Sequence, residues 1–205
     1  MKVCTSMGRD WYLKQRLKRI DEVGEYFNKN VIPTAQLMGV NKFYLEIGCG
    51  HGHWLQSFAS NEPSKLFVGI DLVSKRVVKA NKKKLLSNLN NLYFLKAEAS
   101  ELLDAIKGKL EVAATFIMFP DPWPKKRHLK NRIIQPDFLI QLANVSVHHS
   151  SLYFKTDHRE YFEWTMTHID QNKLWNLKND CWPHDATSFF QNLFDESFTC
   201  SGTKL

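Results

Sequence analysis

Short apolar runs alternate with amphipathic stretches along most of this chain, and the alternation predicts a strand–helix repeat. Short runs of mainly apolar residues predict strands at residues 43–47, 66–70, 92–95, 112–118, 152–155 and 174–177. The stretches between them predict helices at residues 53–60, 74–86, 100–107, 136–145 and 158–169. Repeated strand–helix units favour a doubly wound, mostly parallel α/β sheet with helices on both faces.

The two ends of the chain depart from this alternation. Residues 1–40 mix basic and apolar side chains, so we expect a peripheral, basic N-terminal extension that contains a helix. The tail beyond Asp180 has no clear period, which predicts irregular structure and a short or missing final strand. Because no repeat or linker interrupts the chain, its 205 residues predict a single domain over 1–205.

Composition narrows the class of protein. With 43% hydrophobic and 13% aromatic residues, the chain is expected to be globular. Its net charge of +7 favours binding to anions such as nucleic acid or acidic lipid. One group of cations, Lys75, Lys79, Lys82 and Lys83, follows a single helix face, and a solvated surface is the favoured interpretation of it.

Cysteine spacing and the absence of long apolar runs indicate the compartment. Cysteines at positions 4, 49, 181 and 200 lack the paired spacing of zinc or redox sites, so we expect no metal and a reducing environment. The N-terminus lacks the apolar core of a signal peptide. No apolar run approaches the ~18 residues of a membrane span. We therefore expect a cytoplasmic protein that does not enter a membrane.

A glycine cluster follows the first predicted strand, with Gly48, Gly50 and Gly52 at alternate positions. Glycine lets the backbone turn tightly and approach a ligand closely. A dinucleotide site would place its third glycine one residue later and would bind phosphate, which Glu46 would repel. Glu46 instead suits a cationic or amine-bearing ligand.

Two further carboxylates follow the next two predicted strands. Asp71 is placed to accept hydrogen bonds from ribose hydroxyls. Glu98 stands where an adenine edge would lie, although it could also be an ordinary surface carboxylate. Together with Glu46, these residues resemble the S-adenosylmethionine site of class I methyltransferases. The resemblance implies a Rossmann-like fold with S-adenosyl-L-methionine, which carries no phosphate, as the cofactor.

An aspartate between two prolines follows the fourth predicted strand. Pro120 and Pro122 restrict the backbone around Asp121, and ligands of open α/β sheets bind at strand ends. Five Lys or Arg residues and one His then occupy residues 125–132. A rigid acid beside dense positive charge indicates chemistry on a polyanion. The alternative is a proline-rich turn that leads into a solvated basic helix.

The sequence Phe-Pro-Asp-Pro-Trp-Pro-Lys-Lys-Arg-His, which begins at Phe119, resembles the bacterial tRNA (guanine-N7-)-methyltransferase family. The likeness extends over residues 43–190. It implies methyl transfer from S-adenosylmethionine to N7 of a guanine in tRNA, at position 46 of the variable loop. By this resemblance the cofactor-binding residues are Glu46, Gly48, Gly50, Asp71, Glu98 and Asp121, of which Asp121 is also catalytic. The implied substrate-binding residues are Lys125, Asp157, Thr187, Arg127, His128, Lys130 and Arg132.

One position departs from the family pattern. The family has Thr, any residue, an aromatic residue and Glu near the C-terminus, whereas residues 187–190 place Phe190 at the Glu position. Two rival functions therefore stay open: a catalytically weak RNA-binding protein that keeps the fold, and a methyltransferase for a small molecule or a protein. Trp123 followed by proline resembles the single-chain bacterial enzymes, which implies a monomer or homodimer without an obligatory second subunit.

Overall fold

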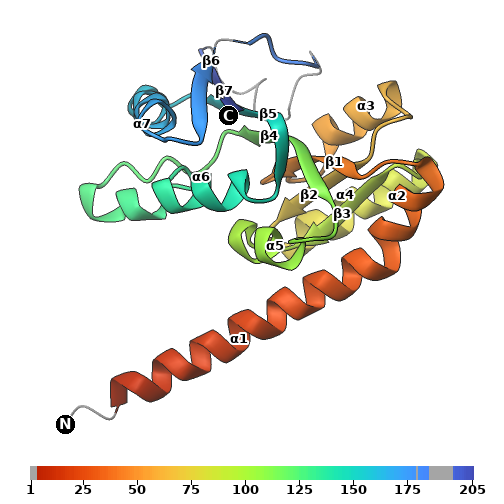
Figure 1. Ribbon diagram of the computed structural model, residues 1–205, viewed down its shortest axis with the longest axis horizontal. Coiled ribbons are helices and arrows are strands. Elements are labelled where there is room, and N and C mark those ends of the chain that lie inside the picture. Colours follow the sequence, from red (N-terminus) through yellow and green to blue (C-terminus); the bar gives the residue numbers. More distant parts are fainter. Residues whose placement is uncertain (1–3, 179, 185–195) are drawn as a thin grey trace.

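A mostly parallel sheet forms the centre of the computed structural model, which describes residues 4–178, 180–184 and 196–205 (Figure 1). Within these residues seven strands follow the order β3-β2-β1-β4-β5-β7-β6. Strands β1 to β5 pair in parallel, and β7 runs antiparallel to both β5 and β6. Their bounds are β1 (Lys42–Ile47), β2 (Phe67–Asp71), β3 (Leu92–Lys96), β4 (Glu111–Met118), β5 (Ser146–Thr156), β6 (Trp175–Lys178) and β7 (Phe198–Lys204). The predicted α/β fold is confirmed.

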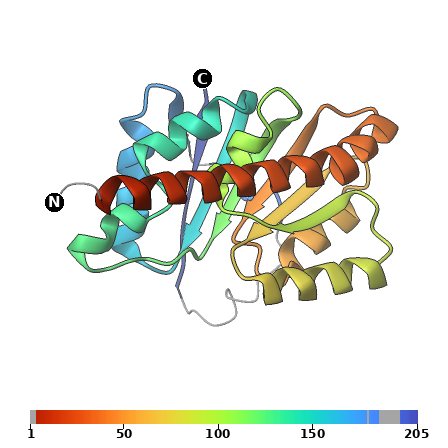
Figure 2. The same ribbon diagram turned by 90° about the horizontal axis from the view of Figure 1, so that it is seen from below.

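Helices cover both faces of the sheet (Figures 1 and 2). They are α1 (Cys4–Tyr26), the π-helix η1 (Phe27–Val31), α2 (Ile32–Met38), α3 (His53–Asn61), α4 (Ser74–Leu86), α5 (Ala99–Ala105), the 3-10 helix η2 (Lys126–Asn131), α6 (Pro136–Ala143) and α7 (Arg159–Asp170). Strand β2 shows why two layers form, because side chains alternate along a strand. Val68 and Ile70 pack on the α5 side, whereas Phe67 packs against α3.

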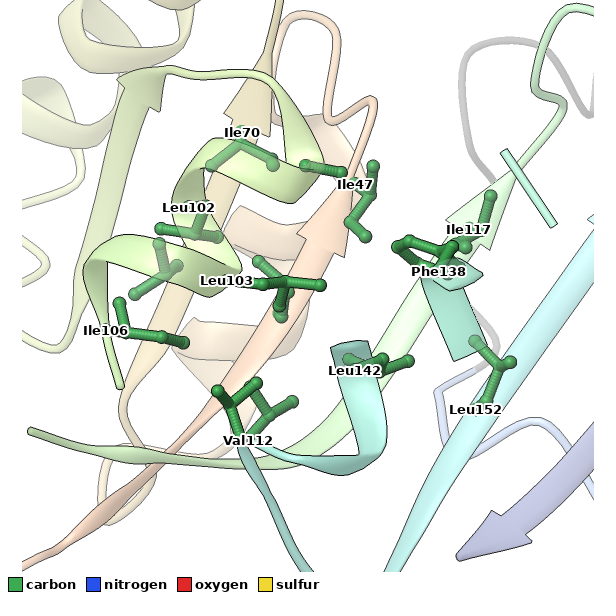
Figure 3. Close-up of a cluster of buried hydrophobic side chains, with 14 of the residues drawn as sticks. Ile47, Ile70, Leu102, Leu103, Ile106, Val112, Ile117, Phe138, Leu142 and Leu152 are labelled. Carbon is green, nitrogen blue, oxygen red and sulfur yellow. The ribbon is translucent and has the colours of Figure 1, made fainter. Parts of the chain in front are cut away.

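The larger hydrophobic cluster lies under α5 and α6 (Figure 3). Leu102 and Leu103 of α5 and Leu142 of α6 pack onto Ile47 and Ile117 of the sheet. Burial of each such side chain stabilises the fold by ~1.5–3 kcal/mol. A second cluster on the opposite face is largely aromatic and comprises Trp54, Phe58, Phe67, Phe94 and Phe116 among others. The two clusters fix the strands whose ends carry the candidate site.

The N-terminal segment is only partly peripheral. Trp11 and Leu17 of α1 are more than half exposed. Val23, Phe27 and Val31, in contrast, are buried in the larger cluster. Figure 2 shows α1 running along the length of the α5 and α6 face. One face of the segment 23–35 therefore packs into the core.

The final strand is present, contrary to expectation. Strand β7 pairs with β5 over six register positions and with β6 over four. After Phe198 the strand carries only small or polar side chains. At Gly202 there is no room for a larger residue, because a Cβ there would lie 2.9 Å from Cγ2 of Ile169. Among the described residues, no helix has both the length and the apolar character needed to cross a membrane.

Candidate functional site

The glycine cluster forms a tight loop between β1 and α3. Gly48, Gly50 and Gly52 all have positive φ angles, of 80°, 55° and 72°, which glycine adopts far more readily than other residues. The amide of Gly48 donates to the carbonyl of Ile70 at 2.8 Å, and that of Gly50 donates to Oδ2 of Asp71 at 3.0 Å. The loop is thereby tied to the end of β2.

Glu46 is a buried acid beside this loop. It lies in the centre of the sheet, in register with Gly69 of β2 and Phe116 of β4. Burial, and then the negative charge of Asp71, raises the pKa of the Glu46 carboxyl to about 8. Its Oε2 atom has no hydrogen-bond partner among the described residues. A buried acceptor without a partner fits a ligand that brings its own donor, such as an ammonium group.

Asp71 ends β2 and is also buried, with 5% of its surface exposed. Its Oδ1 accepts from the amide of Val73 at 2.7 Å, and Arg76 Nη1 lies 3.6 Å from Oδ2. These contacts fix the rotamer of the carboxylate. Because a carboxylate offers about four lone-pair sites, it can still accept hydrogen bonds from ribose hydroxyls.

A cleft of about 680 Å³ lies at the ends of β2 and β3, within the size range of small-ligand sites. Its walls include Leu72, Phe94 and Glu98, and one side is formed by Tyr12 and Arg19 of α1. Glu98 is exposed, and its two carboxylate oxygens accept from the amide and hydroxyl of Ser100 at the start of α5. Glu98 thus caps α5 and lines the cleft where an adenine ring was expected.

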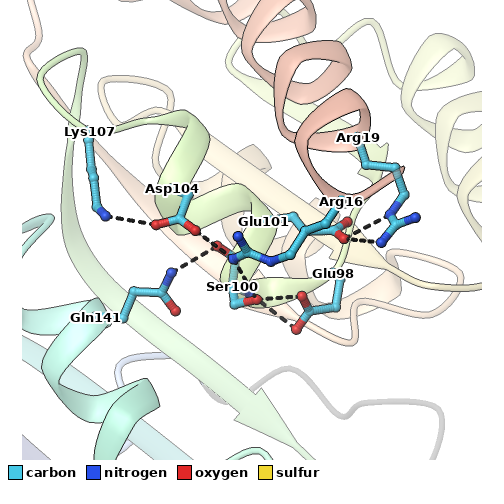
Figure 4. Close-up of polar contacts among 8 residues, drawn as sticks. All are labelled: Arg16, Arg19, Glu98, Ser100, Glu101, Asp104, Lys107 and Gln141. Atoms are coloured by element: carbon cyan, nitrogen blue, oxygen red, sulfur yellow. Dashed lines mark hydrogen bonds and ion pairs between the residues drawn. The ribbon is translucent and has the colours of Figure 1, made fainter. Parts of the chain in front are cut away.

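Ion pairs hold α1 against α5 beside this cleft (Figure 4). Arg19 contacts Glu101 at 2.7 Å, and Arg16 contacts Asp104 at 2.5 Å. The sequence pattern did not predict this contact. The available indication in the sequence was the equal spacing of the charges: the cations at positions 16 and 19 are three residues apart, as are the acids at positions 101 and 104 of α5. The ion pairs therefore help α1 to form one wall of the cleft.

Asp121 lies in a strained turn after β4 and is exposed. Phe119 and Trp123, on either side of it, have positive φ angles of 49° and 44°. Such conformations cost about 1–3 kcal/mol each for residues other than glycine and occur mainly at functional sites. The Phe119 amide donates to the carbonyl of Lys155 at 2.7 Å, which anchors the turn to β5.

Asp157 follows β5 and lies at the same edge of the sheet as Asp121. Met118 of β4 pairs with Lys155 of β5, so the residues after both strands leave the sheet together. Asp157 is exposed, and His158 after it caps α7 by accepting from the amide of Tyr161 at 3.3 Å. The two expected aspartates therefore share one edge.

The predicted basic residues do not all face the solvent. Lys125, Lys126, Arg127 and Lys130 are exposed on and before η2. His128 is half-buried, and its ring centroid lies 5.7 Å from that of Trp123. Arg132 is only 1% exposed. Because Arg132 has so little surface, its expected RNA contact finds no support in the structure. Thr187 and Phe190 lie outside the described residues.

Comparison with known proteins agrees with this geometry. A family model described as "Putative methyltransferase" matches residues 40–197. Over 158 residues the chain is 35% identical to the tRNA (guanine-N(7)-)-methyltransferase of Mesomycoplasma hyopneumoniae, covering 77% of this chain and 78% of that one. Identity is 36% to the protein of the same name from Mycoplasma genitalium (78% and 75% covered) and 32% to that of Halalkalibacterium halodurans (79% and 74%).

Solved structures share the fold at lower identity. An antibiotic-related methyltransferase has a TM-score of 0.59 and 18% identity, with 83% of this chain and 91% of that chain covered. The 16S rRNA methyltransferase KamB has a TM-score of 0.53 and 18% identity, with 80% and 87% covered. Sheet order, glycine loop and acidic strand ends define a class I methyltransferase. Within that class, the chain belongs to the tRNA (guanine-N7-)-methyltransferase family.

Proposed function

We propose that this protein transfers a methyl group from S-adenosylmethionine to N7 of a guanine in tRNA, at position 46 of the variable loop. One observation carries the proposal: the exposed Asp121 follows β4, which pairs with the strand of the buried Glu46, and precedes the exposed cations of η2. The relatives named for this reaction support the choice of substrate.

The residues around the glycine loop fit S-adenosylmethionine. Glu46 offers a buried acceptor without a partner to the amine of the methionyl group. Asp71 is fixed for the ribose hydroxyls, and Glu98 lines the cleft that would receive the adenine. Gly48 and Gly50 let the backbone approach the ligand, because no atom of the described residues lies within 4 Å of the position that a Cβ would take at either glycine. When bound, the cofactor supplies a methyl group on a sulfonium.

Methyl transfer to guanine N7 requires that donor and acceptor be positioned, and it does not require a strong base. Guanine N7 has an in-plane lone pair that is available at neutral pH, so no proton must leave before attack. Alignment of donor and acceptor therefore supplies much of the rate. Positive charge moves onto the purine during transfer, and a fixed carboxylate such as Asp121 stabilises it electrostatically. Asp121 acts as an orienting acceptor and counter-charge in this proposal, and it is not a general base.

The exposed cations would hold the RNA. Lys125, Lys126, Arg127 and Lys130 are placed to contact phosphates, which fixes orientation without reading sequence. N7 lies on the Hoogsteen edge, which proteins reach most easily in splayed or loosely stacked RNA. Asp157 would contact the substrate from the neighbouring strand end. The proposal places the protein in the cytoplasm, as a monomer or homodimer without a second kind of subunit.

A methyl-transfer assay on bulk tRNA tests this function. The protein is incubated with unmodified tRNA and isotope-labelled S-adenosylmethionine, and the nucleosides are separated by mass spectrometry. We expect the label in 7-methylguanosine. A label on another nucleoside would contradict the assignment. RNA binding without any transfer would favour the RNA-binding alternative, and transfer to protein or to a small molecule would favour the third function.

A further inference from the structure

The buried side chain of Arg132 contacts the turn that contains Asp121. Its Nε donates to the carbonyl of Pro122 at 2.9 Å, one residue beyond Asp121. Its Nη2 pairs with Glu160 of α7 at 3.1 Å. The guanidinium lies over the rings of Tyr161 and Trp164, at 4.8 and 5.1 Å from their centroids. One side chain thus joins the turn to α7.

Prolines limit the backbone hydrogen bonds that can fix the turn. Residues 120, 122 and 124 are prolines, which have no amide hydrogen to donate. Its conformation is also strained, because Phe119 and Trp123 both have positive φ angles. The Phe119 amide anchors the strand side of the turn on β5. Arg132 supplies the matching contact on the far side, at the carbonyl of Pro122.

The surroundings of Arg132 are poorly explained by stability alone. The Arg132 guanidinium is buried although its partner Glu160 is 58% exposed, and removing a charged group from water carries a desolvation cost. The Nη1 atom of Arg132 is buried and has no hydrogen-bond partner among the described residues, which is a further penalty. The aromatic side chains of α7 nevertheless fix the segment after Arg132: the Tyr161 hydroxyl accepts from the Ile133 amide at 3.0 Å, and Trp164 Nε1 donates to the Ile134 carbonyl at 2.8 Å.

We propose that Arg132 is a positioning residue for methyl transfer: by fixing the Pro122 carbonyl, it orients the Asp121 carboxylate relative to guanine and cofactor. The inference rests on the proposed function. It gives a different role to a residue that the basic cluster would assign to RNA binding. A positioning role predicts a lower kcat, whereas an RNA contact predicts a higher KM for tRNA.

The test compares Arg132→Lys with Arg159→Lys. Lysine keeps the charge at position 132 but lacks the planar guanidinium group. Its single ammonium cannot contact the Pro122 carbonyl and the Glu160 carboxylate at the same time in the geometry of arginine. We expect kcat to fall ~10–30-fold, with KM for tRNA and Kd for S-adenosylmethionine within ~3-fold of wild type. Arg159 forms an exposed pair with Glu163 on the same helix and serves as the control, with unchanged kinetics. An unchanged kcat, or a rise in KM for tRNA alone, overturns the inference.

Folding of the variants is followed by thermal unfolding and by the stoichiometry of cofactor binding. If Arg132→Lys does not fold, Glu160→Gln serves as the second test of the inference. The Glu160 side chain is 58% exposed, so its replacement creates no cavity in the core. We expect Glu160→Gln to lower kcat ~3-fold at constant KM, since the guanidinium loses its ionic anchor. Full kcat in that variant overturns the inference. Wild-type protein that does not methylate tRNA overturns the proposed function itself, which separates the two failures.

Discussion

The buried Glu46 makes the stability of the ligand-free protein depend on pH. The pKa of its buried carboxyl is about 8 in the folded protein, above the ordinary value of 4.5. The folded state therefore holds this proton more tightly than the unfolded state. The resulting contribution to stability is complete below about pH 4.5 and is lost as the pH rises through about 8. A ligand cation beside Glu46 would lower its pKa and reverse that loss.

Replacement of Glu46 by Gln should make this loss visible. Glutamine cannot ionise. The unfolding free energy of Glu46→Gln, relative to that of wild type, should therefore rise by about 3 kcal/mol between pH 5 and pH 8. Urea denaturation of the ligand-free protein at both pH values measures the difference. A gap between variant and wild type that stays constant with pH would show that Glu46 titrates normally.

Asp71 tests the cofactor assignment at the same scale. Asp71→Ala should weaken binding of S-adenosylmethionine by about 1.5–3 kcal/mol, because hydrogen bonds to a charged acceptor are lost. Titration calorimetry measures the affinity. Asp170→Ala, at an exposed position near the end of α7, is the control and should bind as wild type does. Equal affinity of the Asp71 variant and wild type would contradict the ribose contact.

At the scale of elements, η2 and α4 offer two groups of cations for comparison. Alanine at Lys125, Lys126, Arg127 and Lys130 should weaken tRNA binding and flatten its salt dependence, since each lost phosphate contact lowers the slope by ~0.9 or less. Electrophoretic titration at several salt concentrations measures both effects.

The matched control for that experiment removes charge from α4. Lys75, Lys79 and Lys82 are exposed on this helix, and their replacement by alanine lowers the net charge by a similar amount. We expect little change in the salt slope, because these lysines are interpreted as a solvated face. If the α4 variant flattens the slope and the η2 variant does not, the RNA lies on α4 instead.

Elements whose pattern is apolar and local could be predicted from the sequence, whereas those that depend on distant partners could not. Strands β1 to β5 have apolar runs and appear close to the expected positions, although β5 begins earlier. Strand β7 was not predicted because its buried residues, Cys200, Ser201 and Gly202, form no run of large apolar side chains. The burial of Val23 in α1 and Phe27 in η1 was not predicted, because both have polar neighbours in sequence and find their apolar partners only in the fold.

At the scale of the whole molecule, the parallel sheet explains why so much of the site could be predicted. Strand ends meet at one edge, so residues that follow different strands, such as Asp71, Asp121 and Asp157, lie along that edge. Arg132 could not be placed in this way, because a run of cations does not indicate which of them turns inward. The apolar Ile133 and Ile134 directly after it were the available hint.

Methyl transfer by the Asp121→Asn variant tests the central claim most directly. Asparagine nearly preserves the shape of an exposed side chain, so the fold and much of the tRNA affinity should persist. Formation of 7-methylguanosine should nevertheless fall by ~100-fold or more, as expected when one preorganised charge is lost. Mass spectrometry of nucleosides from tRNA and labelled cofactor measures the product for wild type and variant side by side. Full activity of Asp121→Asn, or a labelled nucleoside other than 7-methylguanosine from wild type, would contradict the account.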